Sequence, residues 1–168
     1  MRTLSLLRHA KSSGVDLTRD DFDRPLNQRG ARDATRMGRF MREHGLVPDL
    51  VLCSDAVRAR ETLTLVLSAF GGAGPRVVFE PKLYLAEPAA ILEVVADVDA
   101  GIGHCLVVGH NPGLHALALA MTVAGDHTAM ALEFPASGLA VIDLDAARWR
   151  ALQPARGRLR LFVSPSQL

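Results

Sequence analysis

Short apolar runs alternate with segments of helical periodicity along most of this chain of 168 residues. The apolar runs, which are typical of buried strands, cover residues 4–7, 50–53, 77–79, 105–109, 139–143 and 159–162. A segment with apolar residues three or four positions apart follows each of the first four runs. This order predicts an α/β fold, a three-layer α/β/α sandwich with a mainly parallel sheet. The last two runs have no long helix between them, so we expect them to pair as an antiparallel hairpin that places an antiparallel strand at the sheet edge.

The composition fits one compact domain that spans residues 1–168, because 49% of the residues are hydrophobic and 22% are charged. Nineteen lysines and arginines against eighteen aspartates and glutamates give a formal charge of +1, which argues against nucleic acid or an anionic membrane as a partner. The chain starts with strand-like residues instead of a signal sequence, and none of its apolar runs approaches the ~20 residues that span a bilayer. We therefore expect a cytoplasmic protein. Because the overall charge is close to zero, any site for an anion must depend on a few neighbouring side chains.

Three features that suggest other chemistry have simpler interpretations. The glycine-rich residues 71–75 precede a strand and lack a following Lys-Ser or Lys-Thr, so they predict a turn and not a nucleotide-binding loop. Cys53 and Cys105 are far apart and lie within apolar runs, so we expect two reduced, buried thiols. Several histidines show no spacing typical of metal ligands, namely His44, His104, His115 and His127. The sequence therefore predicts neither a metal nor a cofactor.

Basic and imidazole side chains follow three of the predicted strands at the point where each strand ends. Arg8 and His9 come directly after the first strand, and His110 follows the fourth. Ser54, a typical N-cap residue, follows the second strand, and Arg58 lies in the first turn of the next helix. Because ligands of open α/β sheets bind beyond the carboxyl ends of the strands, we expect Arg8, His9, Arg58 and His110 to converge.

These converging residues suit a phosphoryl group. Two guanidinium groups can fork onto a phosphoryl dianion, and helix N-termini add backbone N–H donors. One imidazole can donate a further hydrogen bond, which leaves the other free to attack phosphorus. Two nearby arginines should lower the pKa of the attacking ring and keep it neutral near pH 7. The sequence therefore predicts phosphoryl transfer in which arginines supply the positive charge without a metal.

Three ordered motifs resemble the histidine phosphatase (phosphoglycerate mutase-like) superfamily. Residues 7–10, Leu-Arg-His-Ala, resemble its R-H-G/A signature, and residues 54–62 resemble its S-x-x-x-R-A-x-x-T helix start. Residues 108–113, Val-Gly-His-Asn-Pro-Gly, resemble the strand end that carries its second histidine. The chain is most similar to the small bacterial phosphohistidine phosphatases of the SixA type, because of its short length and the sequences of residues 8–13 and 23–30.

This resemblance covers nearly the whole chain and implies a role for each converging residue. His9 is implied as the nucleophile that forms a phosphohistidine. Arg8, Arg58 and His110 are implied as the residues that hold the phosphoryl group. The implied enzyme is a metal-independent phosphatase, and its implied substrate is a phosphohistidine on a protein.

One departure from the family pattern concerns the proton donor. The broader family carries a glutamate in an L-x-E context shortly after the third strand, whereas residues 83–85 here read Leu-Tyr-Leu. Glu87 lies two residues later and is a candidate donor. A glutamate favoured by the dipole at a helix start explains the same residue equally well.

Two other functions stay open at the level of sequence. A phosphatase of small phosphorylated metabolites would use the same four residues, and only its substrates would distinguish it. A non-catalytic phosphate-binding module would be expected to lose the nucleophile or one of the arginines, but this chain keeps all four residues. Residues 11–24 and 84–88 are the segments expected to recognise the substrate.

Overall fold

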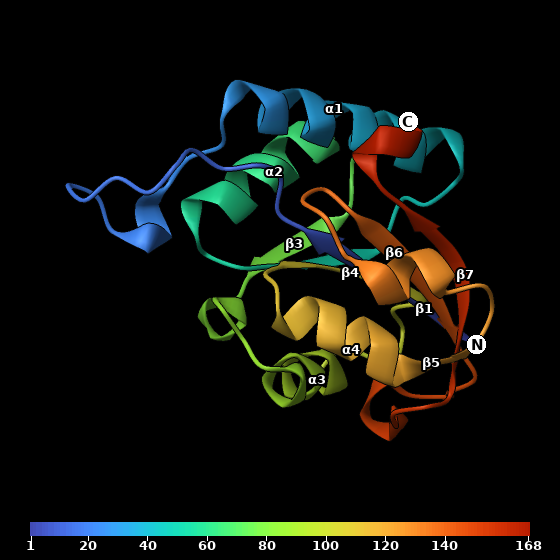
Figure 1. The fold of residues 1–168 in the computed structure, drawn as a ribbon. Coiled ribbons are helices and arrows are strands. Elements are labelled where there is room, and N and C mark those ends of the chain that lie inside the picture. The colour runs from blue at the N-terminus through green and yellow to red at the C-terminus, as the bar shows by residue number, and fades with distance from the viewer.

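A seven-stranded sheet with helices on both faces forms the structure, a computed structural model that describes residues 1–168 (Figure 1). The strands are β1 (Arg2–Arg8), β2 (Leu50–Cys53), β3 (Arg76–Phe79), β4 (His104–Gly109), β5 (Thr122–Ala124), β6 (Leu139–Leu144) and β7 (Gly157–Val163). Their order across the sheet is β3-β2-β4-β1-β6-β7-β5. The strands β3, β2, β4 and β1 pair in parallel, which confirms the predicted α/β fold with a mainly parallel sheet.

The predicted antiparallel pairing is confirmed, but its predicted place at the sheet edge is wrong. The strand β6 pairs antiparallel with both β1 and β7, so the strand that runs against the others lies inside the sheet. The edge is formed by β5, which pairs in parallel with β7. The sequence did not reveal β5, because its three residues follow the helix α4 (Gly113–Met121) without a break and are too few to show a periodicity.

Five α-helices and four short 3-10 helices complete the fold. The α-helices are α1 (Gln28–Glu43), α2 (Val57–Ser68), α3 (Pro88–Ala96), α4 and α5 (Thr128–Leu132). The 3-10 helices cover Asp21–Asp23, Pro81–Leu83, Trp149–Ala151 and Pro165–Gln167. Figure 1 shows α1 and α2 over one face of the sheet and α3 and α4 over the other, which is the predicted three-layer arrangement. None of the helices is long and apolar enough to cross a membrane.

Alternating side chains of the strands supply two hydrophobic cores, one on each face of the sheet. In β1, Leu4 and Leu6 belong to the core beneath α3 and α4, whereas Leu7 belongs to the core beneath α1 and α2. Burial on both faces explains why the strands read as continuous apolar runs. Cys53 and Cys105 are free, buried thiols within these cores, as predicted.

Two glycines let loops approach helix starts near the carboxyl ends of the strands. A Cβ on Gly30, in the first turn of α1, would lie 2.0 Å from the carbonyl oxygen of Lys11. A Cβ on Gly113, the first residue of α4, would lie 1.8 Å from the carbonyl oxygen of Ala86. Only glycine permits such approaches, so these two residues hold the segments that border the site against α1 and α4.

Candidate active site

The register of the sheet brings the predicted site residues together. The parallel pairing of β1 with β4 sets Arg8 opposite Gly109, so the residues after both strands leave the sheet side by side. The ring centres of His9 and His110 are 5.2 Å apart, and the amide of His9 donates to the carbonyl of Gly109 at 3.0 Å. Arg58, the second residue of α2, reaches the same place from the neighbouring strand end. All four predicted residues line one cavity of about 790 Å³.

The ring of His9 is a neutral imidazole with an available lone pair. Its Nδ1 donates to the carbonyl oxygen of Ala10 at 2.8 Å, so the ring proton lies on Nδ1. The other nitrogen, Nε2, keeps its lone pair and accepts the Nε–H of Arg58 at 3.4 Å. The pKa of His9 is lowered to about 4, mainly by burial and in smaller part by the neighbouring arginines, against the opposing effect of the Ala10 carbonyl. The predicted effect of the arginines is therefore present, but burial is the larger cause.

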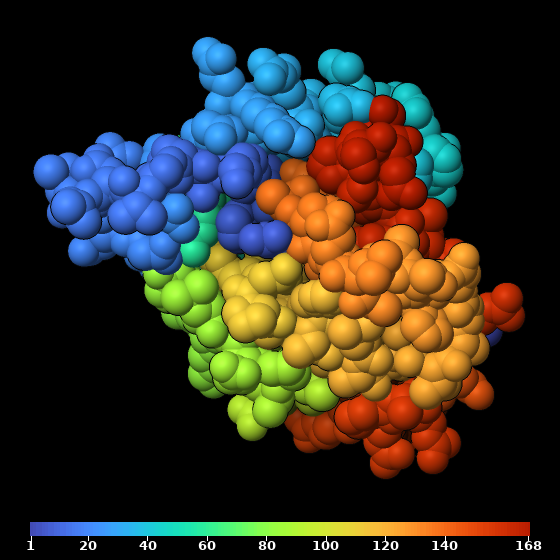
Figure 2. Space-filling model, in the orientation of Figure 1, coloured from blue at the N-terminus to red at the C-terminus, as the bar shows by residue number.

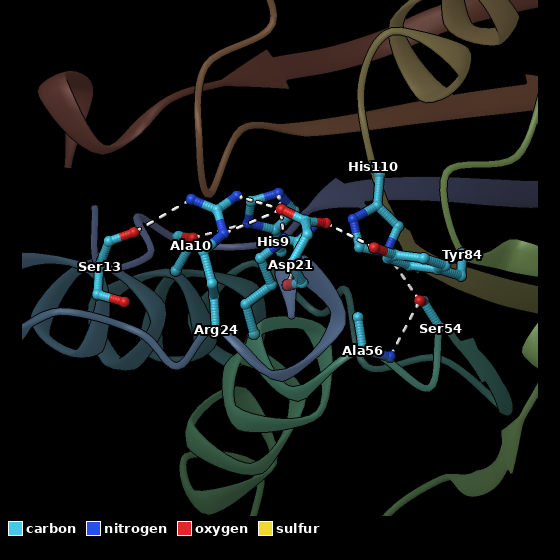
Figure 3. A network of polar contacts seen from close by, with 10 residues as sticks. His9, Ala10, Ser13, Asp21, Arg24, Ser54, Ala56, Tyr84 and His110 are labelled. Carbon is cyan, nitrogen blue, oxygen red and sulfur yellow. Dashed lines mark hydrogen bonds and ion pairs between the residues drawn. The ribbon is translucent and has the colours of Figure 1, made fainter. Parts of the chain in front are cut away.

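Ser54 holds the ring of His110. Its hydroxyl lies 2.7 Å from Nε2 of His110 and accepts the amide N–H of Ala56 at 3.3 Å. The hydroxyl proton can then be donated to Nε2, an arrangement in which the ring proton of His110 is on Nδ1. Nδ1 is buried, has no hydrogen-bond partner in the protein and lies on the side of His9 (Figure 3). Burial lowers the pKa of His110 to about 3, with smaller effects from His9 and the arginines. Ser54 was expected to cap α2, but this helix begins at Val57 after Ala56, and Ser54 orients a site residue instead.

Loops that border the cavity anchor both guanidinium groups. Arg8 donates from Nη1 to the carbonyl oxygen of Phe134 at 3.0 Å, and burial lowers its pKa, with a smaller contribution from Arg58. Arg58 is 2% exposed, and it donates from Nη1 to the carbonyl oxygen of Asp21 at 2.7 Å and from Nη2 to Oδ2 of the same residue at 3.0 Å. The charges of both arginines act on the pKa of His9, so the neutral ring is flanked by two cations.

Asp21 is a residue of the site that the sequence did not reveal. Its Oδ2 accepts from the hydroxyl of Tyr84 at 2.6 Å and from Arg58, and its Oδ1 accepts from Nε of Arg24 at 3.0 Å (Figure 3). The pKa of Asp21 is lowered to about 2, first by the hydrogen bond from Tyr84 and then by Arg58 and Arg24. Asp21 is one of several aspartates in an exposed loop without periodicity and lies 37 positions from Arg58, so no local pattern distinguishes it.

Thr62 ties the segment after β1 to α2. Its hydroxyl accepts the amide N–H of Ala10 at 2.9 Å and donates to the carbonyl oxygen of Arg58 at 2.6 Å. The side chain is fully buried. One hydroxyl thus links the two backbone segments that carry His9 and Arg58, which explains the threonine of the helix-start motif in physical terms.

Glu87, the candidate proton donor, lies outside the cavity. It is the exposed N-cap residue of α3, and its side chain makes no capping hydrogen bond. From the same loop, Leu85 lines the cavity instead. The structure therefore does not bring Glu87 to the other predicted site residues.

The cavity extends well beyond the four predicted residues. Further lining side chains on the side of α1 are Lys11, Ser12, Arg24, Arg29 and Asp33. On the opposite side the cavity is lined by Glu133, Pro135, Ala136 and the C-terminal residues 164–166. Figure 2 shows these segments, in blue, orange and red, meeting on one face of the molecule. Several lining side chains, such as Lys11, Arg29 and Glu133, are exposed, so a phosphoryl group carried by a larger molecule can reach the cavity.

The arrangement places cations and hydrogen-bond donors around an unprotonated ring nitrogen and can hold an anion. His9 supplies the lone pair, the two guanidinium groups supply positive charge, and Nδ1 of His110 supplies a further donor. Donors around one nucleophile match the oxygens of a phosphoryl group during transfer. No group of three or more His, Cys, Asp and Glu side chains is arranged to hold a metal ion. The remaining histidines do not line this cavity, namely His44, His104, His115 and His127.

Comparison with known proteins finds relatives that extend over the whole chain. Residues 4–84 match the family model of the histidine phosphatase superfamily (branch 1). An uncharacterized protein from Mycobacterium leprae (strain TN) is 36% identical over 166 residues, which cover 95% of this chain and 99% of that protein. An uncharacterized protein from Mycobacterium tuberculosis (strain ATCC 25618 / H37Rv) is 37% identical over 164 residues, which cover 95% of this chain and 99% of that protein.

Solved structures share the fold. A protein assigned as phosphohistidine phosphatase SixA from Nakamurella multipartitia matches with a TM-score of 0.85 and 32% sequence identity, over 98% of this chain and 96% of that one. A protein with the same assignment from Agrobacterium tumefaciens matches with a TM-score of 0.82 and 32% identity, over 98% and 99% of the two chains. The protein histidine phosphatase SixA in complex with tungstate has a TM-score of 0.77 at 20% identity over 98% of both chains, which is a likeness of fold.

Proposed function

Since this chain belongs to the histidine phosphatase superfamily and is a phosphatase, we propose that it is a metal-independent protein phosphohistidine phosphatase whose single domain spans residues 1–168. We assign the nucleophile to His9, which becomes phosphorylated during the reaction. The observation that carries this proposal is the neutral ring of His9, whose Nε2 lone pair lies beside the guanidinium of Arg58 and next to a second imidazole.

In the first step, Nε2 of His9 attacks phosphorus. Arg8, Arg58 and Nδ1–H of His110 bind the non-bridging oxygens and stabilise the charge of the transition state. The bond from phosphorus to the leaving nitrogen breaks as the bond to His9 forms. The substrate imidazole takes a proton from solvent on the ring nitrogen that is not bonded to phosphorus. The electron pair of the broken bond then stays on the leaving nitrogen, so the substrate histidine departs as a neutral imidazole and His9 is left phosphorylated.

In the second step, water attacks the phosphorylated His9. The phosphorus–nitrogen bond breaks, its electron pair returns to Nε2, and inorganic phosphate leaves. The Nδ1–H of His9 stays bonded to Ala10 throughout, so the same nitrogen is ready for the next cycle. The two arginines hold the phosphoryl group in both steps and supply the positive charge for which other phosphoryl-transfer enzymes use Mg²⁺.

The nature of the leaving group favours a phosphohistidine over a phosphate monoester. An alkoxide is a strong base, and acid catalysis of its departure is typically worth about 10²- to 10⁴-fold. Glu87 lies outside the cavity, and Asp21, with its pKa lowered to about 2, is ionised at neutral pH. A phosphoramidate nitrogen can be protonated before its bond to phosphorus breaks, so it needs less help from the protein. The exposed side chains around the cavity further support a phosphoryl group that is carried by a protein.

One observation favours a second function, a phosphatase of small phosphorylated metabolites. The cavity of about 790 Å³ is much larger than a phosphoryl group, and the exposed cations Lys11 and Arg29 line it beyond the four site residues. A small molecule with a second anionic group would fit such a cavity.

The experiment that tests the proposal compares kcat/KM on a protein phosphohistidine, an aryl phosphate, phosphoserine and a sugar phosphate, in excess EDTA. We expect the phosphohistidine to be the best substrate, with EDTA without effect, and His9→Ala to lose both turnover and an acid-labile phosphoenzyme. Normal turnover by His9→Ala would refute the mechanism, and loss of activity in EDTA that one divalent ion restores would refute metal independence. A sugar phosphate as the best substrate would establish the metabolite phosphatase, and phosphate binding without any turnover would establish a binding module.

A further inference from the structure

Each nitrogen of the Arg58 guanidinium has a partner within the protein, and one partner is an anion. Its Nε faces Nε2 of His9, its Nη1 donates to the Asp21 carbonyl, and its Nη2 donates to the Asp21 carboxylate. We propose that the Asp21 carboxylate is an internal anion that competes with the phosphoryl group for Arg58 and so weakens binding of inorganic phosphate. This inference rests on the proposed function, because it assigns Arg58 to the phosphoryl group.

The geometry of the guanidinium shows which contact has to be exchanged. The Nε–H and Nη2–H bonds of an arginine point to the same side and form one fork, which is the side that grips an oxyanion with two hydrogen bonds. In Arg58 this fork extends from Nε2 of His9 to Oδ2 of Asp21, at 3.4 and 3.0 Å. A phosphoryl group bonded to Nε2 of His9 needs the same fork. Nη2 carries two N–H groups, so the Asp21 carboxylate and the phosphoryl group would share this nitrogen and compete for its positive charge.

The other contacts of Asp21 can hold its loop in place when the carboxylate gives up its contact with Arg58. Its Oδ2 also accepts from Tyr84 at 2.6 Å, and its Oδ1 forms an ion pair with Arg24 at 2.8 Å. The Nη1 of Arg58, which is not part of this fork, donates to the Asp21 carbonyl at 2.7 Å. When the phosphoryl group takes Nη2, the carboxylate can thus remain with Tyr84 and Arg24. Because its side chain is 46% exposed, water can solvate the displaced oxygen.

The expected consequence is a site that discriminates between phosphate and phosphorylated substrate. Inorganic phosphate has only the phosphoryl contacts with which to displace the carboxylate. A substrate adds contacts elsewhere in the cavity, so it displaces the carboxylate more readily. The product phosphate is then bound weakly and leaves, and phosphate in the surrounding solution inhibits little.

The test measures the dissociation constant of inorganic phosphate by calorimetry, with tungstate as a second probe, for the wild type and Asp21→Asn. The carboxamide keeps the shape and a hydrogen-bond acceptor but removes the charge. We expect Asp21→Asn to bind both anions about 10- to 100-fold more tightly, the range set by one hydrogen bond to a charged group. We also expect KM for an aryl phosphate to fall in parallel. A residue that only supported the loop would weaken binding when it is changed.

The matched control is Asp33→Asn, which removes another carboxylate from the same cavity. Asp33 pairs with Arg29 and Arg36 at 3.7 and 3.6 Å and has no ion pair with Arg58. We expect this variant to change the phosphate dissociation constant by less than about 3-fold, since the charge of Asp33 is paired with Arg29 and Arg36 and not with Arg58. If both variants bind phosphate more tightly to the same extent, the effect comes from the total negative charge of the cavity and the competition for Arg58 is refuted. Unchanged or weaker phosphate binding by Asp21→Asn would also refute the competition.

The outcomes separate this inference from the proposed function. If the wild type forms the phosphoenzyme on His9 but Asp21→Asn binds phosphate no more tightly, only the competition is refuted. If His9 forms no phosphoenzyme and neither protein binds phosphate or tungstate, both proposals are refuted.

Discussion

The hydroxyl of Ser54 lies 2.7 Å from Nε2 of His110, and the other ring nitrogen, Nδ1, is buried without a partner on the side of His9 (Figure 3). We expect Ser54→Ala to leave Nε2 without this partner, so that the ring samples both neutral tautomers and kcat/KM falls about 10-fold, the loss of one buried hydrogen bond. Nitrogen chemical shifts of the His110 ring report the tautomer directly. An unchanged tautomer with an unchanged rate would show that Ser54 does not orient this ring.

Arg58 is expected to be the most important cation of the site. Arg58→Ala should lower kcat/KM by at least about 10²-fold, the scale seen when one preorganised donor to a transition state is removed. The matched control is Arg60→Ala on the same helix, because Arg60 pairs with Asp55 and stacks on Phe79 outside the cavity. Equal losses in the two variants would indicate damage to α2 and not to the phosphate site.

Thr62 is expected to affect both stability and rate, since it links the backbones that carry His9 and Arg58. Thr62→Val keeps the shape but leaves the Ala10 amide and the Arg58 carbonyl without this partner, which should cost about 1–3 kcal/mol of unfolding free energy. Thr62→Ser keeps the hydroxyl and should retain most of the stability and rate. Urea unfolding and kcat/KM measured on the same samples check this, and Thr62→Val with wild-type values of both would contradict the linking role.

Glu87 is expected to contribute little to the hydrolysis of a phosphoramidate, because it lies outside the cavity. Glu87→Gln should change kcat/KM on a phosphohistidine by less than about 10-fold, which is below the range of general acid catalysis. The same variant assayed on a sugar phosphate provides the comparison. If the change removes a strong sugar phosphatase activity, Glu87 is the acid and the metabolite phosphatase is the correct function.

The two histidines of the site are expected to make the protein less stable in mild acid. The pKa values of His9 and His110 are lowered to about 4 and about 3 from an ordinary 6.5, so between these values the unfolded chain binds protons that the folded protein does not. The unfolding free energy should therefore fall as the pH falls below about 6.5, by up to about 1.4 kcal/mol per pH unit for each ring. Urea unfolding from pH 7 to pH 5 measures this, and His9→Gln should make the decline shallower. A constant stability over this range would show that the rings titrate normally.

The sequence by itself determined the parts of this protein that depend on local patterns. Apolar runs and helical periodicity predicted six of the seven strands and the four long helices, because burial on two faces or on one stripe leaves a repeating pattern in neighbouring residues. The same patterns placed Arg8, His9, Arg58 and His110 at the strand ends or in the following helix turn. Parallel strands end at one edge of a sheet, so this local information was sufficient to predict that the four side chains converge.

Only the tertiary structure decided the contacts that join segments far apart in the chain. Asp21 is 37 residues from Arg58 and 63 residues from Tyr84, and the Ser54 hydroxyl meets His110 across 56 residues. Such pairs leave no periodic pattern, because each side chain is compatible with its own local structure, whether as a loop aspartate or as a helix cap. The short edge strand β5 also depends on a distant partner, because its three residues are a strand only through their pairing with β7. The four converging side chains are therefore local features of the sequence, whereas the hydrogen-bond partners of His110 and Arg58 are properties of the packed molecule.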